Sequence, residues 1–297
     1  TLFSGEVTVT TADDKILLDG QCSLREAIAV VRGVRANADC PATSSNYNRI
    51  LFDASLANAT LTISDNYGPF ELTSNVQVEI DASAAPGFKI DGAQKWQIAS
   101  IAADADVAII GLGFRHGGPI VSPGVDGGCL VNSGNLVLND TSFDSCFAEH
   151  NGGAIHNTSA GNLAVVDSQF SNNAAGLHDN NPIEDRTFGG AIFNENKTTI
   201  RSSQFTANQS NTAGGAIENR GTLDLGDSTF SNNFSFGGGA LDVAAGSADV
   251  ETTTFNDNEG QILAEDPAVL GGAAISIASG ATMTLSDSTL SNNVLWC

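Results

Sequence analysis

The chain has 297 residues and a formal net charge of −22, from 34 acidic and 12 basic residues. A negative field of this size repels polyphosphates and anionic membrane surfaces, and the basic residues are scattered, which excludes nucleic acid as a partner. No run of about 18 apolar residues occurs, so we expect no transmembrane segment. Glycine, serine, threonine and asparagine outweigh the strong helix formers, which indicates a fold rich in strands and turns.

The first patterned segment begins at Cys22, where apolar residues recur at helical spacing in SLREAIAVVRGVRAN. Ser23 and Glu26 match a capping box, in which each side chain bonds a backbone amide at the helix start, and Gly33 ends the helix. The end of a strand solenoid exposes unpaired edges and an apolar cross-section. We therefore expect residues 1–49 to form an N-terminal cap containing one amphipathic helix.

The heptapeptide CSLREAI resembles the signature of the bacterial CSLREA domain, which is found near the mature amino terminus of secreted β-helix proteins. This resemblance implies export, a right-handed parallel β-helix, and an extracellular or cell-surface location. It implies no particular chemistry, because a fold does not determine a function. The start at Thr1, with neither a methionine nor a signal peptide, is typical of a processed product.

The cysteines form two local pairs and one single residue. Cys22 with Cys40, and Cys129 with Cys146, each bracket one short unit, so we predict two disulfides and an oxidising compartment. Reduced, buried thiols are the alternative. Cys297 has no local partner, and it is either free, intermolecular, or paired with a segment outside this chain.

Residues 50–126 carry strand-like patterns such as VQVEIDAS and VAIIGLGF, and from Gly127 onward the chain repeats. Six segments carry GG or GA followed by alternating apolar residues and then [ST]x[FL]xxN or a close variant. Periods of about 25 residues with strand alternation predict a solenoid. We expect an all-β, single-stranded, right-handed parallel β-helix over residues 50–297, with about ten coils. Over residues 127–297 the repeats also resemble those of polymorphic outer-membrane proteins, the autotransporter-like adhesins.

Two columns of equivalent residues follow from the repeat. One is apolar and should stack inside the coils: Phe143, Phe170, Phe205, Phe230, Phe255 and Leu290. The other should form a ladder of side-chain amides: Asn173, Asn208, Asn233, Asn258 and Asn293. The Gly-Gly pairs mark corners that need either positive φ or close backbone approach. Longer separations between copies predict inserted loops near residues 177–188 and 261–270.

The sequence offers no convincing catalytic centre. Basic residues that could act in a polysaccharide lyase are few in the central coils: Arg115, His116, Arg186, Arg201 and Arg220. Carboxylates that could pair in a hydrolase either recur at one repeat position or lie in the first inserted loop: Asp167, Asp227, Asp287, Glu184 and Asp185. We assign no catalytic residue.

Ligand and modification sites are equally sparse. His150, His156 and His178 lack a recognisable metal-ligand pattern, and we assign no metal site and no cofactor. Asp104 and Asp106 offer at most weak Ca²⁺ binding, without the repeat of Ca²⁺-loaded β-rolls. Of the sequons, those at Asn157 and Asn196 are the candidate glycosylation sites.

Two functional hypotheses remain. The first is an extracellular structural or adhesive β-helix, in which the chain associates end to end, as in a surface layer or head-to-tail filament, or binds other surface proteins and glycans. The second is a polysaccharide lyase or hydrolase on a pectate-lyase-like β-helix. The first is favoured because the repeated residues are all accounted for by corners, core and ladder.

Overall fold

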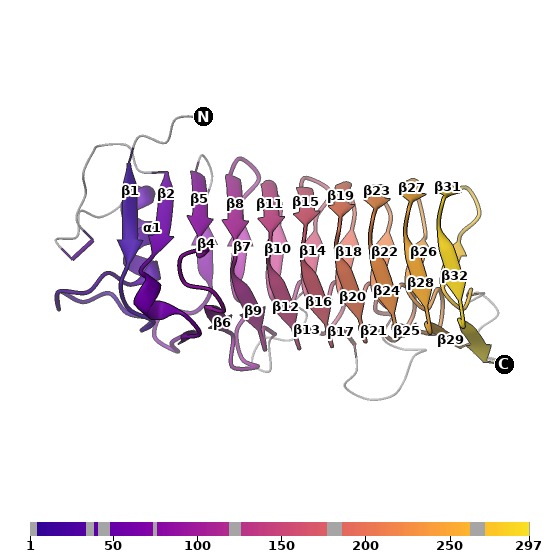
Figure 1. Ribbon diagram of the computed structural model, residues 1–297, viewed down its shortest axis with the longest axis horizontal. Helices are drawn as coiled ribbons and strands as arrows, with labels where there is room; N and C mark the ends of the chain where they lie inside the picture. Colours follow the sequence, from indigo (N-terminus) through magenta and orange to yellow (C-terminus); the bar gives the residue numbers. More distant parts are fainter. Residues whose placement is uncertain are drawn as a thin grey trace.

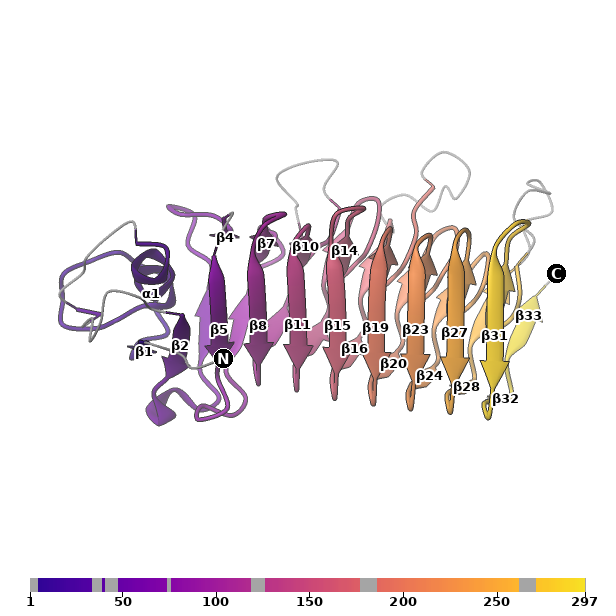
Figure 2. The ribbon, with the colours of Figure 1, turned by 90° about the horizontal axis from the view of Figure 1, so that it is seen from above.

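The computed structural model describes residues 5–33, 39–40, 48–73, 76–118, 126–176, 186–261 and 271–296. The chain winds as a right-handed parallel β-helix, with the strands of successive coils side by side along the long axis (Figures 1 and 2). Neighbouring strands pair in parallel within all four sheets. The predicted fold class is confirmed.

Sheets A and B have the most strands and extend along most of the β-helix axis. Sheet A has ten strands, in agreement with about ten coils: β1 (Glu6–Val9), β2 (Arg49–Phe52), β5 (Gln77–Asp81), β8 (Asp106–Ile110), β11 (Asn135–Asn139), β15 (Asn162–Val166), β19 (Lys197–Arg201), β23 (Thr222–Gly226), β27 (Ser247–Glu251) and β31 (Thr282–Ser286). Sheet B has nine: β3 (Thr60–Thr62), β6 (Lys89–Asp91), β9 (Gly113–Arg115), β12 (Ser142–Asp144), β16 (Gln169–Ser171), β20 (Gln204–Thr206), β24 (Thr229–Ser231), β28 (Thr254–Asn256) and β32 (Thr289–Ser291).

The other two sheets close each coil. Sheet C has eight strands: β4 (Phe70–Leu72), β7 (Ala99–Ile101), β10 (Leu130–Asn132), β14 (Ile155–Asn157), β18 (Ile192–Asn194), β22 (Ile217–Asn219), β26 (Leu241–Val243) and β30 (Ile275–Ile277). Sheet D has six: β13 (Phe147–Ala148), β17 (Ala174–Ala175), β21 (Gln209–Ser210), β25 (Phe234–Ser235), β29 (Glu259–Gln261) and β33 (Val294–Trp296). A repeat coil therefore runs through sheets C, A, B and D in turn.

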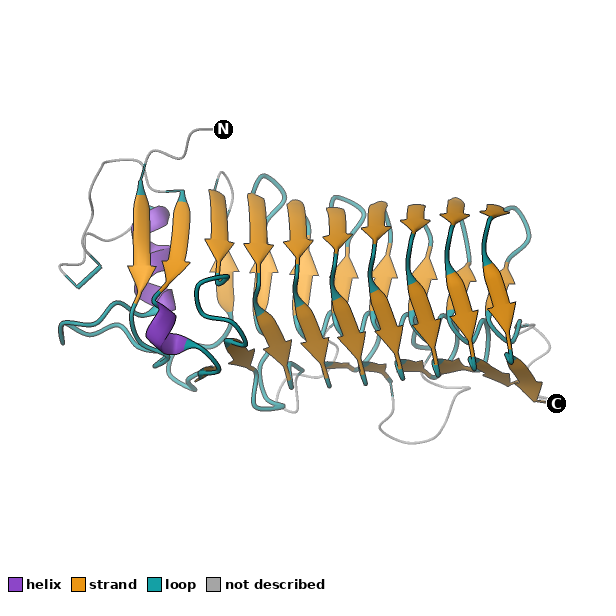
Figure 3. Ribbon diagram, in the orientation of Figure 1, coloured by secondary structure: helices purple, strands orange, loops and turns teal. Residues whose placement is uncertain are grey.

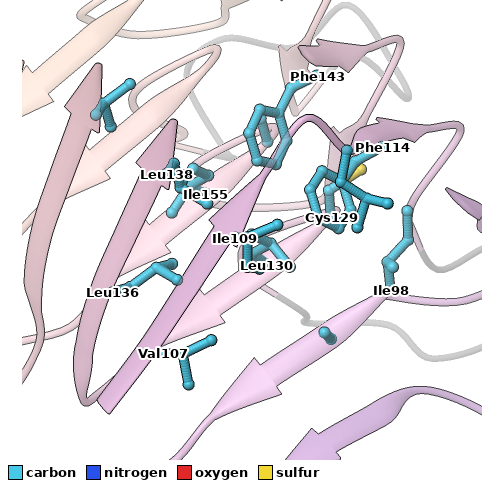
Figure 4. Close-up of a cluster of buried hydrophobic side chains, with 14 of the residues drawn as sticks. Ile98, Val107, Ile109, Phe114, Cys129, Leu130, Leu136, Leu138, Phe143 and Ile155 are labelled. Carbon is cyan, nitrogen blue, oxygen red and sulfur yellow. The ribbon is translucent and has the colours of Figure 1, made fainter. Parts of the chain in front are cut away.

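The core fills the space between the sheets. Alternate residues of sheet A point inward, so Leu136 and Leu138 are buried while Val137 between them is exposed. Figure 4 shows these leucines together with Leu130 and Ile155 of sheet C in one cluster of buried side chains. The period-two pattern of the sequence is thus the inside–outside alternation of the coil wall.

The predicted phenylalanine stack is present and longer than expected. The ring centres of Phe143 and Phe170 are 4.8 Å apart, and the two ring planes differ by 5°. Phe114, outside the predicted column, begins the run of stacked rings. Leu290 pairs in register with Phe255, but its side chain is 48% exposed, so the expectation that Leu290 is buried is wrong. It lies in the last coil that the structure describes.

The predicted asparagine ladder is confirmed, from Asn173 to Asn293. In it, Asn208 Nδ2 donates to Asn233 Oδ1 at 3.0 Å, and the same oxygen accepts the backbone N–H of Asn208. Buried amide groups are thereby satisfied from coil to coil.

A second ladder, which the repeat alignment missed, ends the sheet C strands: Asn132, Asn157, Asn194 and Asn219. Asn157 is fully buried in it, with its Nδ2 donating to Asn194 Oδ1 at 2.8 Å. The proposal of Asn157 as a glycosylation acceptor is therefore wrong, because a glycan cannot be attached to a sealed amide. Asn196 is half-buried and its Nδ2 donates to Gly161 O, so it stays a candidate.

The Gly-Gly corners show both features expected from the sequence: the first glycine has a positive φ, and the second lies close to the backbone of the next coil. Gly189 has φ of 67°, in the left-handed region that glycine adopts freely. A Cβ on Gly190 would lie 2.1 Å from the carbonyl oxygen of Gly215 in the next coil. The first glycine therefore makes the turn, and the second lets adjacent coils approach.

The one helix among the described residues, α1 (Leu24–Val31), lies at the N-terminal end of the solenoid beside β1 and β2 (Figure 3). The predicted capping box is present, with Ser23 as N-cap and Glu26 completing it. Gly33, at φ of 66°, follows the helix. The cap was predicted for residues 1–49 as a separate segment, but β1 belongs to sheet A, so the β-helix already begins at Glu6.

The charged residues of CSLREAI hold this cap in place. Arg25 Nε bonds Asp14 Oδ1 at 2.6 Å, and its guanidinium carbon lies 4.3 Å from the Phe70 ring centre. Glu26 also accepts the backbone N–H of Leu17 at 2.9 Å. The motif is therefore accounted for by structure.

Both predicted disulfides are formed, Cys22–Cys40 and Cys129–Cys146. Cys297 lies outside the described residues, as do 177–185 and 262–270 of the predicted loops. The first loop was predicted to end at residue 188, but Thr187 is buried and Phe188 bridges the neighbouring coils at Asn151 and Ala213. This insertion therefore rejoins the stack earlier than the sequence suggested. Gln261 similarly belongs to β29.

Candidate functional site

Apart from Arg186 and Arg220, which line one cleft, the basic residues considered for a lyase lie on different faces. Arg115 Nε contacts Asp91 Oδ2 at 2.8 Å on the sheet B side, and His116 faces the same carboxylate. Arg201 Nη2 contacts Asp224 Oδ1 at 2.6 Å on sheet A. These groups do not converge on one centre.

The recurring aspartates belong to turns. Asp167, Asp227 and Asp287 have φ of 49°, 52° and 48°, between the strands of sheets A and B. Aspartate tolerates this left-handed conformation better than most residues. Their interpretation as a repeat feature is confirmed.

Two of the candidate metal ligands, His156 and Asp106, contact other polar side chains. His156 lies between Glu195 Oε2, 3.0 Å from its Nε2, and Asp126 Oδ2, 3.5 Å from its Nδ1. Asp106 accepts a hydrogen bond from Asn135 at 2.6 Å. His178, Glu184 and Asp185 lie outside the described residues. Within the described ranges, no group of three or more His, Cys, Asp or Glu side chains could hold a metal ion.

A different constellation lies on the outer face of sheet C. The middle residue of each three-residue strand points away from the core, because its two neighbours point inward. From β14 to β30 these middle residues stand in register: His156, Phe193, Glu218, Asp242 and Ser276. Like charges directly opposite on adjacent strands repel, so the neighbouring Glu218 and Asp242 need a physical explanation.

Part of the explanation for this carboxyl pair is that Arg220 and two phenylalanines cover Glu218. Arg220 Nε donates to Glu218 Oε1 at 3.1 Å, and the Glu218 side chain is only 1% exposed. The Arg220 guanidinium carbon lies 4.5 Å from the ring centre of Phe188 and 4.8 Å from that of Phe193. Phe188 is positioned by its bridges to the neighbouring coils.

The other part of the explanation is the raised pKa of both carboxyl groups. Burial raises the pKa of Glu218 well above its ordinary range, and the negative charge of Asp242 raises it further. Burial also raises the pKa of Asp242, against the hydrogen bond from Ser276. Oε2 of Glu218 is buried without a donor among the described residues. The raised pKa favours a proton on Glu218, and a proton on Oε2 would let this oxygen donate to Asp242 and would remove the repulsion between the two carboxyl groups.

These residues line a cleft of about 450 Å³, which we call the sheet C cleft. Its wall combines two arginines and an aromatic ring with carboxyl and hydroxyl groups: Arg186, Phe188, Glu218, Arg220, Asp242, Ser276 and Ser279. Three of these side chains, those of Glu218, Asp242 and Ser276, come from paired strands of sheet C. Concave sites with a few convergent polar groups and perturbed pKa values are characteristic of binding and active sites.

The carboxyl geometry favours binding over hydrolysis. Glycoside hydrolases hold two accessible carboxyl groups roughly 5 to 10 Å apart, whereas Glu218 and Asp242 interact directly. Glu218 is also too buried to reach a substrate atom. Its physical role is to orient Arg220.

Arg186 and Arg220 were candidates from the sequence, whereas Glu218, Asp242 and Phe193 were not recognised. A signal was available, since GGAIEN and GGALDV place acidic residues at equivalent positions of adjacent copies. These acidic positions indicate a binding site only once it is known that they face outward and that Phe188 covers them. An alignment of repeats does not reveal either fact.

No family model, curated protein or solved structure matches the chain. Among the described residues, no helix is long and apolar enough to span a membrane.

Proposed function

We propose that this chain is an extracellular adhesive β-helix protein that binds glycans in the sheet C cleft. The observation that carries the proposal is the cleft itself, where Arg220, Asp242 and Ser276 converge on one concave surface of a rigid solenoid. Sugars present many hydroxyl groups, which charged and hydroxyl side chains bind in matched donor–acceptor pairs.

An extracellular location is supported by two features. The disulfides Cys22–Cys40 and Cys129–Cys146 fit an oxidising compartment. The resemblance of CSLREAI to the signature of secreted β-helix proteins fits export. End-to-end self-association of the chain stays a prediction.

Closing the cleft tests the proposal. Ala244 lines the cleft and is half-buried, so Ala244→Trp should fill it, while Ala164→Trp places the same ring on the outer face of sheet A. We expect the unmodified protein and Ala164→Trp to bind a subset of a printed array of neutral and acidic oligosaccharides, and Ala244→Trp to lose that binding at least tenfold.

Two results would overturn the proposal: no binding to any oligosaccharide, or equal binding by Ala244→Trp. Incubating the bound oligosaccharides with the protein and separating the products distinguishes adhesion from catalysis. Turnover that Ala244→Trp abolishes would establish the lyase or hydrolase alternative instead.

A further inference from the structure

Arg220 is held in one orientation with part of its donor set unused. Its Nε bonds Glu218, and its guanidinium packs against the rings of Phe188 and Phe193. Among the described residues, neither terminal nitrogen of Arg220 has a hydrogen-bond partner, and the side chain is 38% exposed within the wall of the cleft. The terminal NH₂ groups therefore stand ready for a ligand.

The geometry of those two nitrogens selects the kind of ligand. A guanidinium presents its terminal donors in one plane, at the spacing of the two oxygens of a carboxylate, and binds them through two parallel hydrogen bonds. Packing against two rings and the bond to Glu218 fix that plane before a ligand arrives, which lowers the entropy cost of binding.

The local charge is compatible with an anion although the chain as a whole is strongly acidic. Burial and the charge of Asp242 raise the pKa of Glu218, which favours its neutral form and so weakens its compensation of the positive charge of Arg220. Arg186 lines the same cleft. Asp242 is the other carboxyl group in the described wall of the cleft; burial raises its pKa, and a hydrogen bond from Ser276 opposes that rise.

The cleft suits a sugar better than a peptide. An extended peptide binds a β-protein chiefly by adding a strand at a free sheet edge. Around Arg220 the strands are already paired on both sides, β22 with β18 and β26, and β26 with β22 and β30, so this part of the cleft offers no backbone edge. Only β30, the end strand of sheet C, has an unpaired edge among the described strands of the cleft. The neighbouring hydroxyls of Ser276 and Ser279 instead match the hydroxyl groups of a sugar ring.

We infer that the sheet C cleft selects sugars bearing a carboxylate, and that the terminal nitrogens of Arg220 bind that carboxylate in a bidentate manner. This inference rests on the proposed glycan binding and adds the chemical class of the ligand. Arg220 is the specificity-determining residue, and Glu218, Phe188 and Phe193 position it.

The test compares acids with their esters. Titration calorimetry is run with galacturonate, glucuronate and sialate oligosaccharides, each paired with its methyl ester, which keeps the ring and removes the charge. We expect at least one acid to bind the unmodified protein at least tenfold more tightly than its ester. Arg220→Lys keeps the charge but loses the planar fork, and it should weaken acid binding about tenfold, clearly more than it weakens ester binding.

Arg201→Lys, on sheet A, is the matched control and should bind like the unmodified protein. Thermal unfolding of each variant verifies that it folds, and the acid–ester comparison on the unmodified protein needs no variant. Equal affinity for every acid and its ester overturns the inference but leaves glycan binding standing. Full retention of acid binding in a folded Arg220→Lys removes the bidentate role, whereas binding to no oligosaccharide overturns both proposals.

Discussion

Glu218 illustrates how a residue on the outside of a coil becomes a buried one. The strand alternation points its side chain outward, and the segment that returns at Phe188 then covers it together with Arg220. A carboxylate left ionised there, beside Asp242, would face both desolvation and repulsion. A protonated carboxyl group avoids both penalties, because it carries no charge and can donate a hydrogen bond.

This protonation makes stability depend on pH. Because the pKa of Glu218 is raised in the folded state, the folded chain keeps a proton that the unfolded chain releases above about pH 4.5. The free energy of unfolding should therefore fall as the pH rises from that value toward the raised pKa. Glu218→Gln, which has no proton to release, should lose this part of the decline.

Urea unfolding between about pH 5 and pH 8 measures the effect. Glu251→Gln, at an exposed position of β27, is the matched control and should follow the unmodified protein. If the curves of the unmodified protein and Glu218→Gln run parallel, Glu218 does not carry the proton.

At the scale of the residue, the sequence predicted positions that repeat and missed those that break the repeat. The Phe170 and Asn208 columns each recur in five of the six copies, so their roles could be inferred from period and residue type alone. Asn157 was misjudged because a sequon is a local pattern, whereas burial in a ladder depends on the neighbouring coils. Arg220 was noticed, but its partner on the preceding strand was not.

At the scale of the element, the corner between sheets D and C leaves no room for a side chain. The second glycine of each pair lies against the backbone of the following coil, where a side chain would meet a carbonyl oxygen. A backbone atom cannot move aside as the end of a flexible side chain can. The recurrence of GGA is therefore a packing constraint between coils as well as a turn signal.

Gly190→Ala should be strongly destabilising for this reason. Its Cβ would lie 2.1 Å from Gly215 O and 2.5 Å from Gln209 N. We expect a loss of about 3 kcal/mol in the free energy of unfolding, at the upper end of overpacking effects. Gly226→Ala is the control, since the nearest atom to its Cβ is the flexible Arg201 Cδ at 3.2 Å.

Chemical denaturation of the two variants decides the matter. A cost for Gly190→Ala no greater than for Gly226→Ala would show that adjacent coils can separate at the corner without penalty. The steric explanation of the Gly-Gly pair would then fail, and only the positive φ of Gly189 would remain.

At the scale of the whole molecule, each coil contacts chiefly the coils before and after it. In such a solenoid, stability is close to a sum of coil terms and nearest-neighbour terms. The first strands pack against α1, which the Cys22–Cys40 disulfide and Arg25 secure. A change in the cap should therefore act on nearby coils and fade with distance along the axis.

Ser23→Ala tests this locality. Ser23 is buried, its hydroxyl donates to Lys15 O at 2.6 Å, and it accepts the Glu26 amide at 3.2 Å. Losing an N-cap costs about 1 kcal/mol. Native-state hydrogen exchange should show reduced protection of β1 and β2 and unchanged protection from β15 onward, because the intervening coils remain paired.

Ser55→Ala, at an exposed hydroxyl of the short 3₁₀ turn Ala54–Leu56, is the control and should alter neither region. A uniform loss of protection along all coils in Ser23→Ala would mean that the solenoid unfolds as one cooperative unit and that the cap stabilises the whole rod.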